Sequence, residues 1–343
     1  MKACKGNSFL FVCLIALVAT TLPGSVFSAE SFIRLKYTSF MPPTHVISQL
    51  SDQWGKELEK RTNGKIKVSY FPAGTLVSGN QTYDGIVKGI VDVGFGIMSY
   101  TPGRMPLSEF IVLPNGYKSG AQASRMANAF YKKFKPKEFD EVKLFYLHAH
   151  GPAFFHTKKQ VTKIEELRGL RIKGDGNTSK VIAAAGATPT TMPMLETYDA
   201  IKRGLADGVL NPMETLKGWK FGEVCKYTYI NHGNSYGNGF FVAMNKERWS
   251  SFPQDIQQII DKLNEEWFEK QAKLWTWVDE DAIEYAKKTG QKFFYASPAD
   301  EARMMGMMKP LYDNYIKSMK EKGLPGEEVL QWCHEWLKNA SAD

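Results

Sequence analysis

The chain has 343 residues, of which 43% are hydrophobic and 13% aromatic, so it can build one large or two medium-sized cores. Its formal net charge is +8, from 44 Lys and Arg against 36 Asp and Glu. The basic residues are scattered and form no run of five, which argues against a nucleic-acid-binding surface. A mild basic excess instead favours small anions as ligands.

The N-terminal segment predicts export. Lys2 and Lys5 precede an apolar run at residues 8–22, and a Ser28–Ala29 junction follows a proline-glycine break. This order is typical of a secretory signal peptide over residues 1–28, cleaved after Ser28. The apolar run is too short for a comfortable membrane span. We therefore expect an exported, soluble chain.

Hydrophobic periodicity predicts an α/β chain in which strands and helices alternate. Strands are expected at residues 31–39, 65–71, 92–97, 143–149, 154–158, 170–173, 207–210, 227–231, 239–245 and 292–295. Helices are expected at residues 45–62, 81–89, 121–134, 195–204, 254–288, 299–322 and 326–338, and a further one after an N-cap at Thr178 or Ser179. Residues 99–113 and 186–193 are expected to be loops. The order strand, helix, strand, helix, strand over residues 31–97 predicts a parallel sheet.

One sequence pattern occurs twice. Tyr-Asp-x-Ile-x-x-Gly-x-x-Asp is found at residues 83–92 and again at 198–207. Each copy places a glycine at the end of an amphipathic helix and an acidic residue at the start of a short apolar strand. The repeat predicts two similar α/β lobes with a cleft between them.

Two motifs raise the alternative of an enzyme or a metal site. Residues 233–237 match G-x-S-x-G, which in a serine hydrolase requires a strand, a sharp turn and then a helix. Here an apolar strand follows, so a secreted hydrolase using Ser235 is a remote alternative. His148 and His150 share one face of a strand, with His156 nearby, but no second cluster of ligating residues accompanies them. We expect no catalytic residue, cofactor or metal.

Polar and aromatic residues gather where strands are expected to end. Lys173 ends one strand beside two glycines, and Tyr100, Trp219 and Tyr236 lie in loops at comparable edges. In open α/β sheets such edges form the ligand site, where a lysine can meet an anion and aromatic rings can cover it.

The chain resembles the solute receptors of tripartite ATP-independent periplasmic (TRAP) transporters, the DctP-like group. The resemblance covers essentially the whole chain after the signal segment. The features that carry it are, in chain order, Pro42-Pro43-x-His45, Gly89-x-x-Asp92-x-Gly94, Leu167-x-Gly169-Leu170-x-Ile172, Gly186-Ala187-x-Pro189 with Met192-Pro193, Gly204-x-x-Asp207-Gly208, Asn211-Pro212, and Met244-Asn245-Lys246 before Trp249 and Pro253.

The resemblance implies a two-lobed periplasmic binding protein with a central cleft and a long helix spanning both lobes. Lobe I would comprise residues 29–150 and about 240–290, and lobe II residues 151–239 and about 291–343, with the C-terminal helices. Such a receptor closes around one small organic anion and delivers it to the small and large membrane subunits of the permease. We expect a periplasmic monomer without enzymatic activity.

The family usually has an arginine at the position of Lys173, and a second one near Ala153 and Phe154 is also missing. A lysine offers a point charge in place of planar, bidentate recognition. A sulfonate such as isethionate is therefore the first expectation, and a small carboxylate or aromatic acid is the alternative. The expected ligand-binding residues are Lys173, Asn211, Arg104, Tyr100, His150, Trp219, Tyr236 and Asn80. Whether Cys225 and Cys333 form a disulfide stays open.

Overall fold

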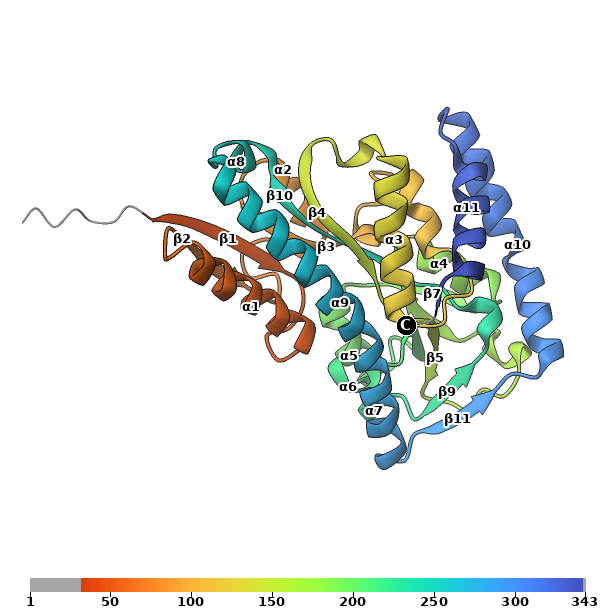
Figure 1. The fold of residues 1–343 in the computed structure, drawn as a ribbon. Coiled ribbons are helices and arrows are strands. Elements are labelled where there is room, and N and C mark those ends of the chain that lie inside the picture. Colours follow the sequence, from red (N-terminus) through yellow and green to blue (C-terminus); the bar gives the residue numbers. More distant parts are fainter. Residues whose placement is uncertain (1–31, 342–343) are drawn as a thin grey trace, which may run out of the picture. The chain divides into compact units, whose positions relative to one another are not determined.

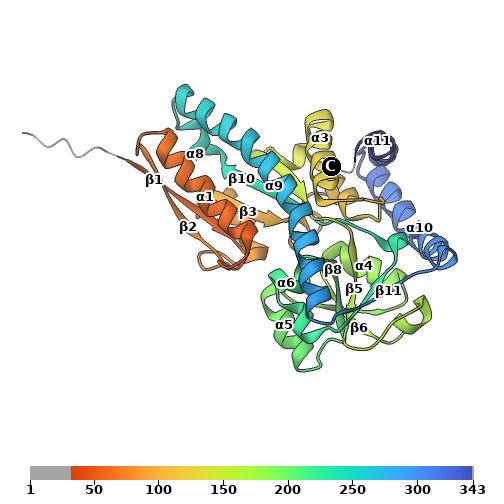
Figure 2. The same cartoon turned by 60° about the horizontal axis from the view of Figure 1, so that its bottom comes forward.

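The computed structural model describes residues 32–341, so the expected signal peptide lies outside the described residues. Two β-sheets organise this part of the chain, and helices cover their faces (Figures 1 and 2). We refer to the halves built on them as the first and second lobes. The chain is of the α/β class, as the alternation of strands and helices predicts.

The first lobe holds a five-stranded sheet in the order β2-β1-β3-β10-β4. Its strands are β1 (Ile33–Ser39), β2 (Ile66–Phe71), β3 (Val93–Ile97), β4 (Val142–Ala149) and β10 (Gly239–Asn245). Its main helices are α1 (Val46–Arg61), α2 (Thr82–Val87), α3 (Gly120–Phe134) and α8 (Lys246–Ser250).

The second lobe holds a six-stranded sheet in the order β11-β9-β5-β8-β6-β7. Its strands are β5 (Ala153–Thr157), β6 (Arg171–Gly174), β7 (Thr188–Thr191), β8 (Gly208–Pro212), β9 (Tyr227–Ile230) and β11 (Lys292–Tyr295). Its helices are α4 (Gly176–Ala184), α5 (Met194–Lys202), α6 (Thr215–Gly218) and α7 (Phe221–Val224).

The repeated sequence pattern corresponds to a repeated structure. The first copy lies on α2 and the turn before β3, and the second on α5 and the turn before β8. In each lobe the strand that follows the pattern belongs to a set of three parallel strands, ordered β2-β1-β3 and β7-β6-β8. The final aspartate of each copy makes an equivalent hydrogen bond. A carboxylate oxygen of Asp92 accepts the backbone N–H of Lys36 at 2.7 Å, and a carboxylate oxygen of Asp207 accepts the backbone N–H of Arg171 at 2.9 Å. Both acids thereby tie the start of the third strand to the first.

The parallel pairing predicted for the strands at residues 31–39, 65–71 and 92–97 is confirmed, because β1 pairs in parallel with both β2 and β3. The complete sheets are mixed. β10 runs antiparallel to both of its neighbours, β3 and β4, and β5 does the same between β8 and β9. These two strands begin where the chain crosses between lobes, after Ala149 and after Asn238. A strand that starts at the crossing must run away from it, while β1, β3, β6 and β8 run toward it. The carboxyl ends of those parallel strands therefore face the space between the lobes.

Three long helices complete the structure. α9 (Gln254–Lys288) has the predicted bounds and packs on α1, α3 and β4 of the first lobe and on α6 of the second (Figure 2). α10 (Pro298–Glu321) contacts α4, and α11 (Gly326–Asn339) packs on α3. The C-terminal helices therefore contact both lobes.

Two local predictions were wrong. The expected loop at 186–193 contains β7, an edge strand in which Pro189 is tolerated because one side of the strand has no ladder partner. The helix for which Thr178 or Ser179 was the expected N-cap begins earlier, at Gly176, with Asp175 at the N-cap position in extended conformation. In addition, two short 3₁₀ helices, Met98–Tyr100 and Leu107–Val112, occupy the expected loop at 99–113.

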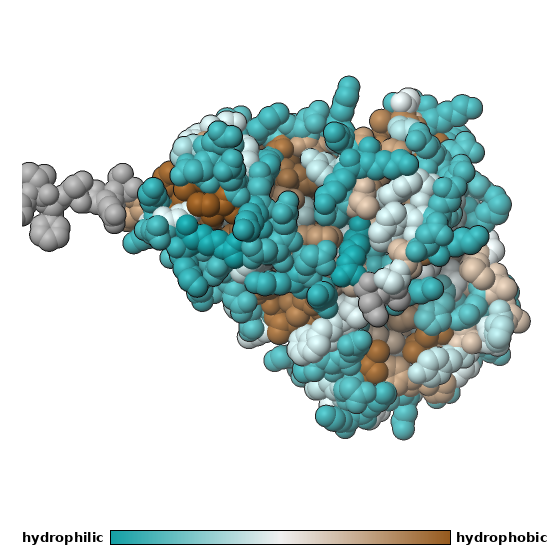
Figure 3. Space-filling model, viewed as in Figure 1, coloured by the Kyte–Doolittle hydropathy of each residue, from teal (hydrophilic) through white to brown (hydrophobic). Residues whose placement is uncertain are grey.

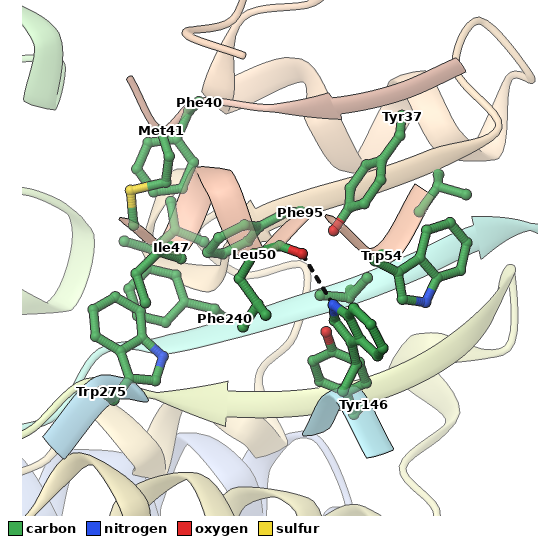
Figure 4. Packing of buried hydrophobic residues seen from close by; sticks show 14 of the residues in the cluster. Tyr37, Phe40, Met41, Ile47, Leu50, Trp54, Phe95, Tyr146, Phe240 and Trp275 are labelled. Carbon is green, nitrogen blue, oxygen red and sulfur yellow. Dashed lines mark hydrogen bonds between the residues drawn. The ribbon is translucent and has the colours of Figure 1, made fainter. Parts of the chain in front are cut away.

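Aromatic side chains dominate the core between the first sheet and α9. Figure 4 shows Tyr37, Trp54, Phe95 and Tyr146 packed together, with Phe40, Phe240 and Trp275 at the other end of the cluster. The indole N–H of Trp267 donates to the backbone carbonyl of Leu50 at 2.9 Å, so this buried donor has a hydrogen-bond partner within the core. The cluster extends to residues of the second lobe, including Met194 and Trp219.

The surface view shows mainly hydrophilic side chains with small apolar patches between them (Figure 3). Within residues 32–341, no helix is long and apolar enough to cross a membrane. In the described part of the chain, Cys225 and Cys333 are both free and buried, in different hydrophobic clusters, and burial raises the pKa of the Cys225 thiol to about 12. No disulfide joins them.

Candidate ligand-binding site

The candidate site is a cavity of about 30 Å³ at the carboxyl ends of the parallel strands, lined by residues of both lobes and by Trp275 of α9. A larger cavity of about 290 Å³ lies between the Leu107–Val112 turn, α4 and α10. We choose the smaller one because six of the predicted binding residues line it, and strand carboxyl ends are where α/β folds bind ligands. Those six are Lys173, Asn211, Tyr100, His150, Trp219 and Tyr236.

Lys173 is buried at the end of β6, and its ammonium donates to a carboxylate oxygen of Asp175 at 3.0 Å. The two side chains are 3% and 11% exposed, so water screens this ion pair very little. Lys173 is the only Lys or Arg that lines the cavity in the described part of the chain. The positive charge expected from the sequence is present, but an internal acid already neutralises it.

Met194, at the start of α5, connects several of the binding residues. Its sulfur lies 3.8 Å from the Lys173 ammonium and 3.9 Å from the Asn211 amide nitrogen. Its backbone N–H donates to the hydroxyl of Tyr100 at 3.2 Å, a contact from the second lobe to the first. Burial raises the pKa of Tyr100 well above its ordinary value, so the hydroxyl stays neutral.

His150 lines the cavity, but both of its ring nitrogens are engaged. Nε2 accepts the backbone N–H of Asn238 at 3.1 Å, and Nδ1 lies 2.6 Å from the carbonyl oxygen of Gly151. The proton must therefore be on Nδ1, where it is donated to that carbonyl. Burial lowers the pKa of His150 to about 4, so the ring is neutral near pH 7. His150 therefore forms part of the cavity wall, and its hydrogen bond with Asn238 joins the two segments that cross between the lobes.

Four aromatic rings form a continuous wall along the cavity. Trp219 stacks on Phe40 at 6.5 Å between centroids, Phe40 stacks on Phe240 at 6.4 Å, and Phe240 stacks on Trp275 at 5.1 Å. Figure 4 shows the last three of these side by side. Tyr236 also lines the cavity, with its hydroxyl donating to the carbonyl of Leu210 at 2.9 Å. The wall is therefore mainly aromatic and apolar.

Arg104 and Asn80 lie outside the cavity. The Arg104 guanidinium donates to Glu141 at 2.9 Å and lies over the ring of Tyr83, because the turn before it directs the side chain toward α2 and the start of β4. Asn80 is exposed, and its side-chain oxygen accepts the hydroxyl of Ser78 at 2.7 Å. Neither residue belongs to the site as the structure presents it.

Sequence reasoning missed several lining residues, chiefly Asp175, Glu214, Asn238, Phe40, Phe240 and Trp275. Asp175 follows β6 directly and Glu214 lies two residues after the end of β8, so their position near strand ends was a usable signal. Trp275 had no such signal, because it lies in the middle of α9 and reaches the cavity only through the packing of that helix.

The motifs that suggested chemistry are explained by structure. Ser235 follows a 3₁₀ turn at His232–Asn234 and leads into β10, so the strand–turn–helix context of a nucleophile elbow is missing. His148 accepts the indole N–H of Trp275 at 2.8 Å, and His156 contacts the hydroxyl of Thr228 and the carbonyl of Asn211. Within residues 32–341, no group of His, Cys, Asp or Glu could hold a metal ion.

Two lobes, a cleft at the strand ends and a helix packed across both define a two-lobed solute-binding protein. Residues 37–318 match the bacterial extracellular solute-binding proteins of family 7 (DctP), and the chain belongs to this family. Its members are substrate-binding receptors of transporters and not enzymes, which removes the hydrolase alternative.

Several solved structures have the same fold. A TRAP periplasmic solute-binding protein of Desulfovibrio salexigens is 30% identical, with a TM-score of 0.81 over 91% of this chain and 98% of that chain. One from Bordetella bronchiseptica with bound (R)- and (S)-mandelate is 28% identical, with a TM-score of 0.81 over 89% and 99%. A marine metagenome protein specific for aromatic acids, in complex with 3-hydroxybenzoate, is 25% identical, with a TM-score of 0.84 over 90% and 98%.

Proposed function

We propose that this protein is the periplasmic receptor of a TRAP transporter and binds a small carboxylate with an aromatic body. The observation that carries the proposal is the buried Lys173 ammonium in a cavity whose wall is a stack of aromatic rings. The ammonium suits a carboxylate, and the aromatic wall suits an aromatic ring. Asn211 and Tyr100 lie beside Met194 at the same end and are available to orient the polar group.

The ligand class depends on two features of the cavity, the Lys173 ammonium and the aromatic wall. A lysine can hold a sulfonate or a carboxylate, so Lys173 by itself does not separate isethionate from an aromatic acid. The apolar wall decides the order, because isethionate has too little apolar surface to cover it. Aromatic ligands of the Bordetella and metagenome relatives support the same order. An aromatic acid is thus the first candidate and a sulfonate the second.

Ligand entry requires the lobes to separate. A cavity of about 30 Å³ is far below the roughly 300–1,000 Å³ of typical small-molecule pockets. The bend is expected where strands cross between the lobes, near residues 149–151 and 239–241, with lobe I at residues 29–150 and about 240–290. Lobe II would comprise residues 151–239 and about 291–343. Contacts to ligand from both sides then favour the closed form.

The same proposal assigns the partners. A receptor of this family delivers its ligand to a TRAP membrane permease, and we expect both the small and the large permease subunit to take part. We expect the receptor itself to be a monomer that reaches the periplasm through the signal peptide at residues 1–28.

The test is a thermal-shift screen of the chain from Ala29 onward, with mandelate, 3-hydroxybenzoate, benzoate and isethionate, followed by calorimetry on each hit. A ligand that binds only the folded state raises the melting temperature. The proposal expects at least one aromatic acid to bind more tightly than isethionate. An isethionate hit without an aromatic one would overturn the aromatic class and restore the sulfonate.

A further inference from the structure

The cavity contains more negative charge than a receptor for a plain anion needs. Lys173 is paired with Asp175 at 3.0 Å, and a second carboxylate, Glu214, lines the same space. Both acids are buried, with 7% and 4% of their residue surface exposed. A ligand that brought only a carboxylate would add a third negative group near one lysine, in a place where water cannot screen the repulsion.

Hydrogen-bond acceptors are also left over. The side-chain oxygen of Asn238, a residue that is 4% exposed and lines the cavity, has no hydrogen-bond partner among residues 32–341. The amide nitrogen of Asn238 donates to the hydroxyl of Ser99 at 3.1 Å, which fixes the orientation of the amide. A buried acceptor without a donor is costly, so this oxygen calls for an N–H or O–H group on the ligand.

The aromatic wall suits a cation as well as a ring. The rings of Trp219, Phe40, Phe240 and Trp275 line the cavity, and indole rings attract cations most strongly among aromatic side chains. Glu214 lies next to this wall, because His45 contacts both its carboxylate, at 2.9 Å, and the ring of Trp219. A positively charged nitrogen would therefore find a carboxylate, an amide oxygen and aromatic rings among the residues that line this one cavity.

We propose that the natural ligand is a zwitterion, in which a cationic nitrogen accompanies the carboxylate, such as an aromatic α-amino acid. Its carboxylate takes the Lys173 side of the cavity, and its nitrogen meets Asp175, Glu214 and the Asn238 oxygen. This inference rests on the proposed receptor function and narrows its ligand class. It also explains why the only lysine or arginine among the cavity-lining residues described here is held by an acid: the pair separates when a ligand supplies both opposite charges.

The experiment compares ligands that differ in one group, on the wild-type chain at pH 7. Phenylacetate, mandelate and phenylglycine share one skeleton and carry hydrogen, hydroxyl or ammonium on the α-carbon. Phenylalanine and 3-phenylpropionate form a second, longer pair. The proposal expects the ammonium member of at least one set to bind roughly tenfold or more tightly than its uncharged counterparts.

Asp175→Asn supplies an independent readout. Removing this acid frees Lys173, so plain carboxylates should bind more tightly and the advantage of the amino acids should shrink. Glu214→Gln is the matched second variant at the other carboxylate. If both ligand types change in parallel in Asp175→Asn, the acid is only structural and the proposal fails. If this variant does not fold, the wild-type ligand series decides without it.

The outcomes separate the two proposals. Tight binding of mandelate or phenylacetate with equal or weaker binding of the amino acids overturns the zwitterion and leaves the aromatic-acid receptor standing. Preference for the amino acids supports both. Binding of none of these compounds, with isethionate binding instead, overturns both together.

Discussion

Nε2 of His45 lies 2.9 Å from a carboxylate oxygen of Glu214, and this contact joins the first lobe to the second beside the ligand cavity. Nδ1 of His45 accepts the backbone N–H of Ile47 at 3.2 Å and so caps α1. Nδ1 therefore carries no proton, and Nε2 donates to Glu214. One buried imidazole both begins a helix and holds the lobes together.

Replacing this histidine should loosen the closed form. His45→Asn keeps a side chain that caps helices well but is too short to reach Glu214. Losing a hydrogen bond to a charged group costs about 1.5–3 kcal/mol, so ligand affinity should fall roughly tenfold or more. Calorimetry gives the affinity, and small-angle scattering with saturating ligand should show a larger radius than wild type.

The control for that variant is Lys217→Ala. Lys217 pairs with Asp281 at 2.6 Å, between α6 and α9, but its side chain is 47% exposed. Exposed pairs contribute about 0–1 kcal/mol, so affinity and scattering should stay close to wild type. If His45→Asn behaves like this control, the contact does not hold the lobes together.

Lys173→Met should weaken a carboxylate ligand by about 1–3 kcal/mol, because the ligand loses its charged donor and faces an unpaired Asp175. Lys180→Met is the matched control, since Lys180 lies on α4 nearby but is exposed. Titration calorimetry with the best ligand of the screen measures both. Equal affinities in the two variants would show that Lys173 does not contact the ligand.

Gly176→Ala should disturb the approach of the two lobes. Gly176 has φ of +44°, and a β-carbon there would lie 2.5 Å from the backbone oxygen of Ser99 in the first lobe. Gly169→Ala is the control for backbone strain alone. Gly169 also has a positive φ, of +80°, but an added β-carbon there would meet no described atom within 4 Å. Both variants should lose roughly 1–2 kcal/mol of unfolding free energy. Only Gly176→Ala should also weaken ligand binding, and equal affinities would exclude the contact.

Acid should destabilise the protein through three buried histidines. Burial lowers the pKa from the ordinary 6.5 to about 3 for His148 and to about 4 for His150 and His156. Between pH 6.5 and 4 the unfolded chain binds more protons at these sites than the folded one, so lowering the pH favours unfolding. Urea unfolding at pH 7 and pH 5 should show a lower free energy at pH 5.

His156→Gln isolates one of these groups, since an amide can replace the ring in its contacts with Thr228 and Asn211. The variant should lose less free energy than wild type between pH 7 and pH 5. An identical pH dependence would mean that other groups cause the acid effect.

Local sequence patterns predicted most of the fold. Strand and helix positions followed from periodicity, and α9 begins and ends at the predicted residues. The repeat at 83–92 and 198–207 predicted two similar lobes. In the structure its final aspartates have equivalent roles, since Asp92 and Asp207 accept the backbone N–H of Lys36 and Arg171, respectively, in a neighbouring parallel strand. Strand ends likewise predicted four of the residues that line the cavity, and the family resemblance added Asn211 and His150.

The sequence alone determined which elements form and which of their ends hold polar and aromatic residues, because both depend on neighbours along the chain. Only the tertiary structure decided that Asp175 neutralises Lys173, that Trp275 reaches the cavity from the middle of α9, and that Arg104 turns to Glu141 instead. It also decided that β5 and β10 run against their neighbours. Each of these depends on how distant segments approach, and the period of a single helix or strand contains no such information.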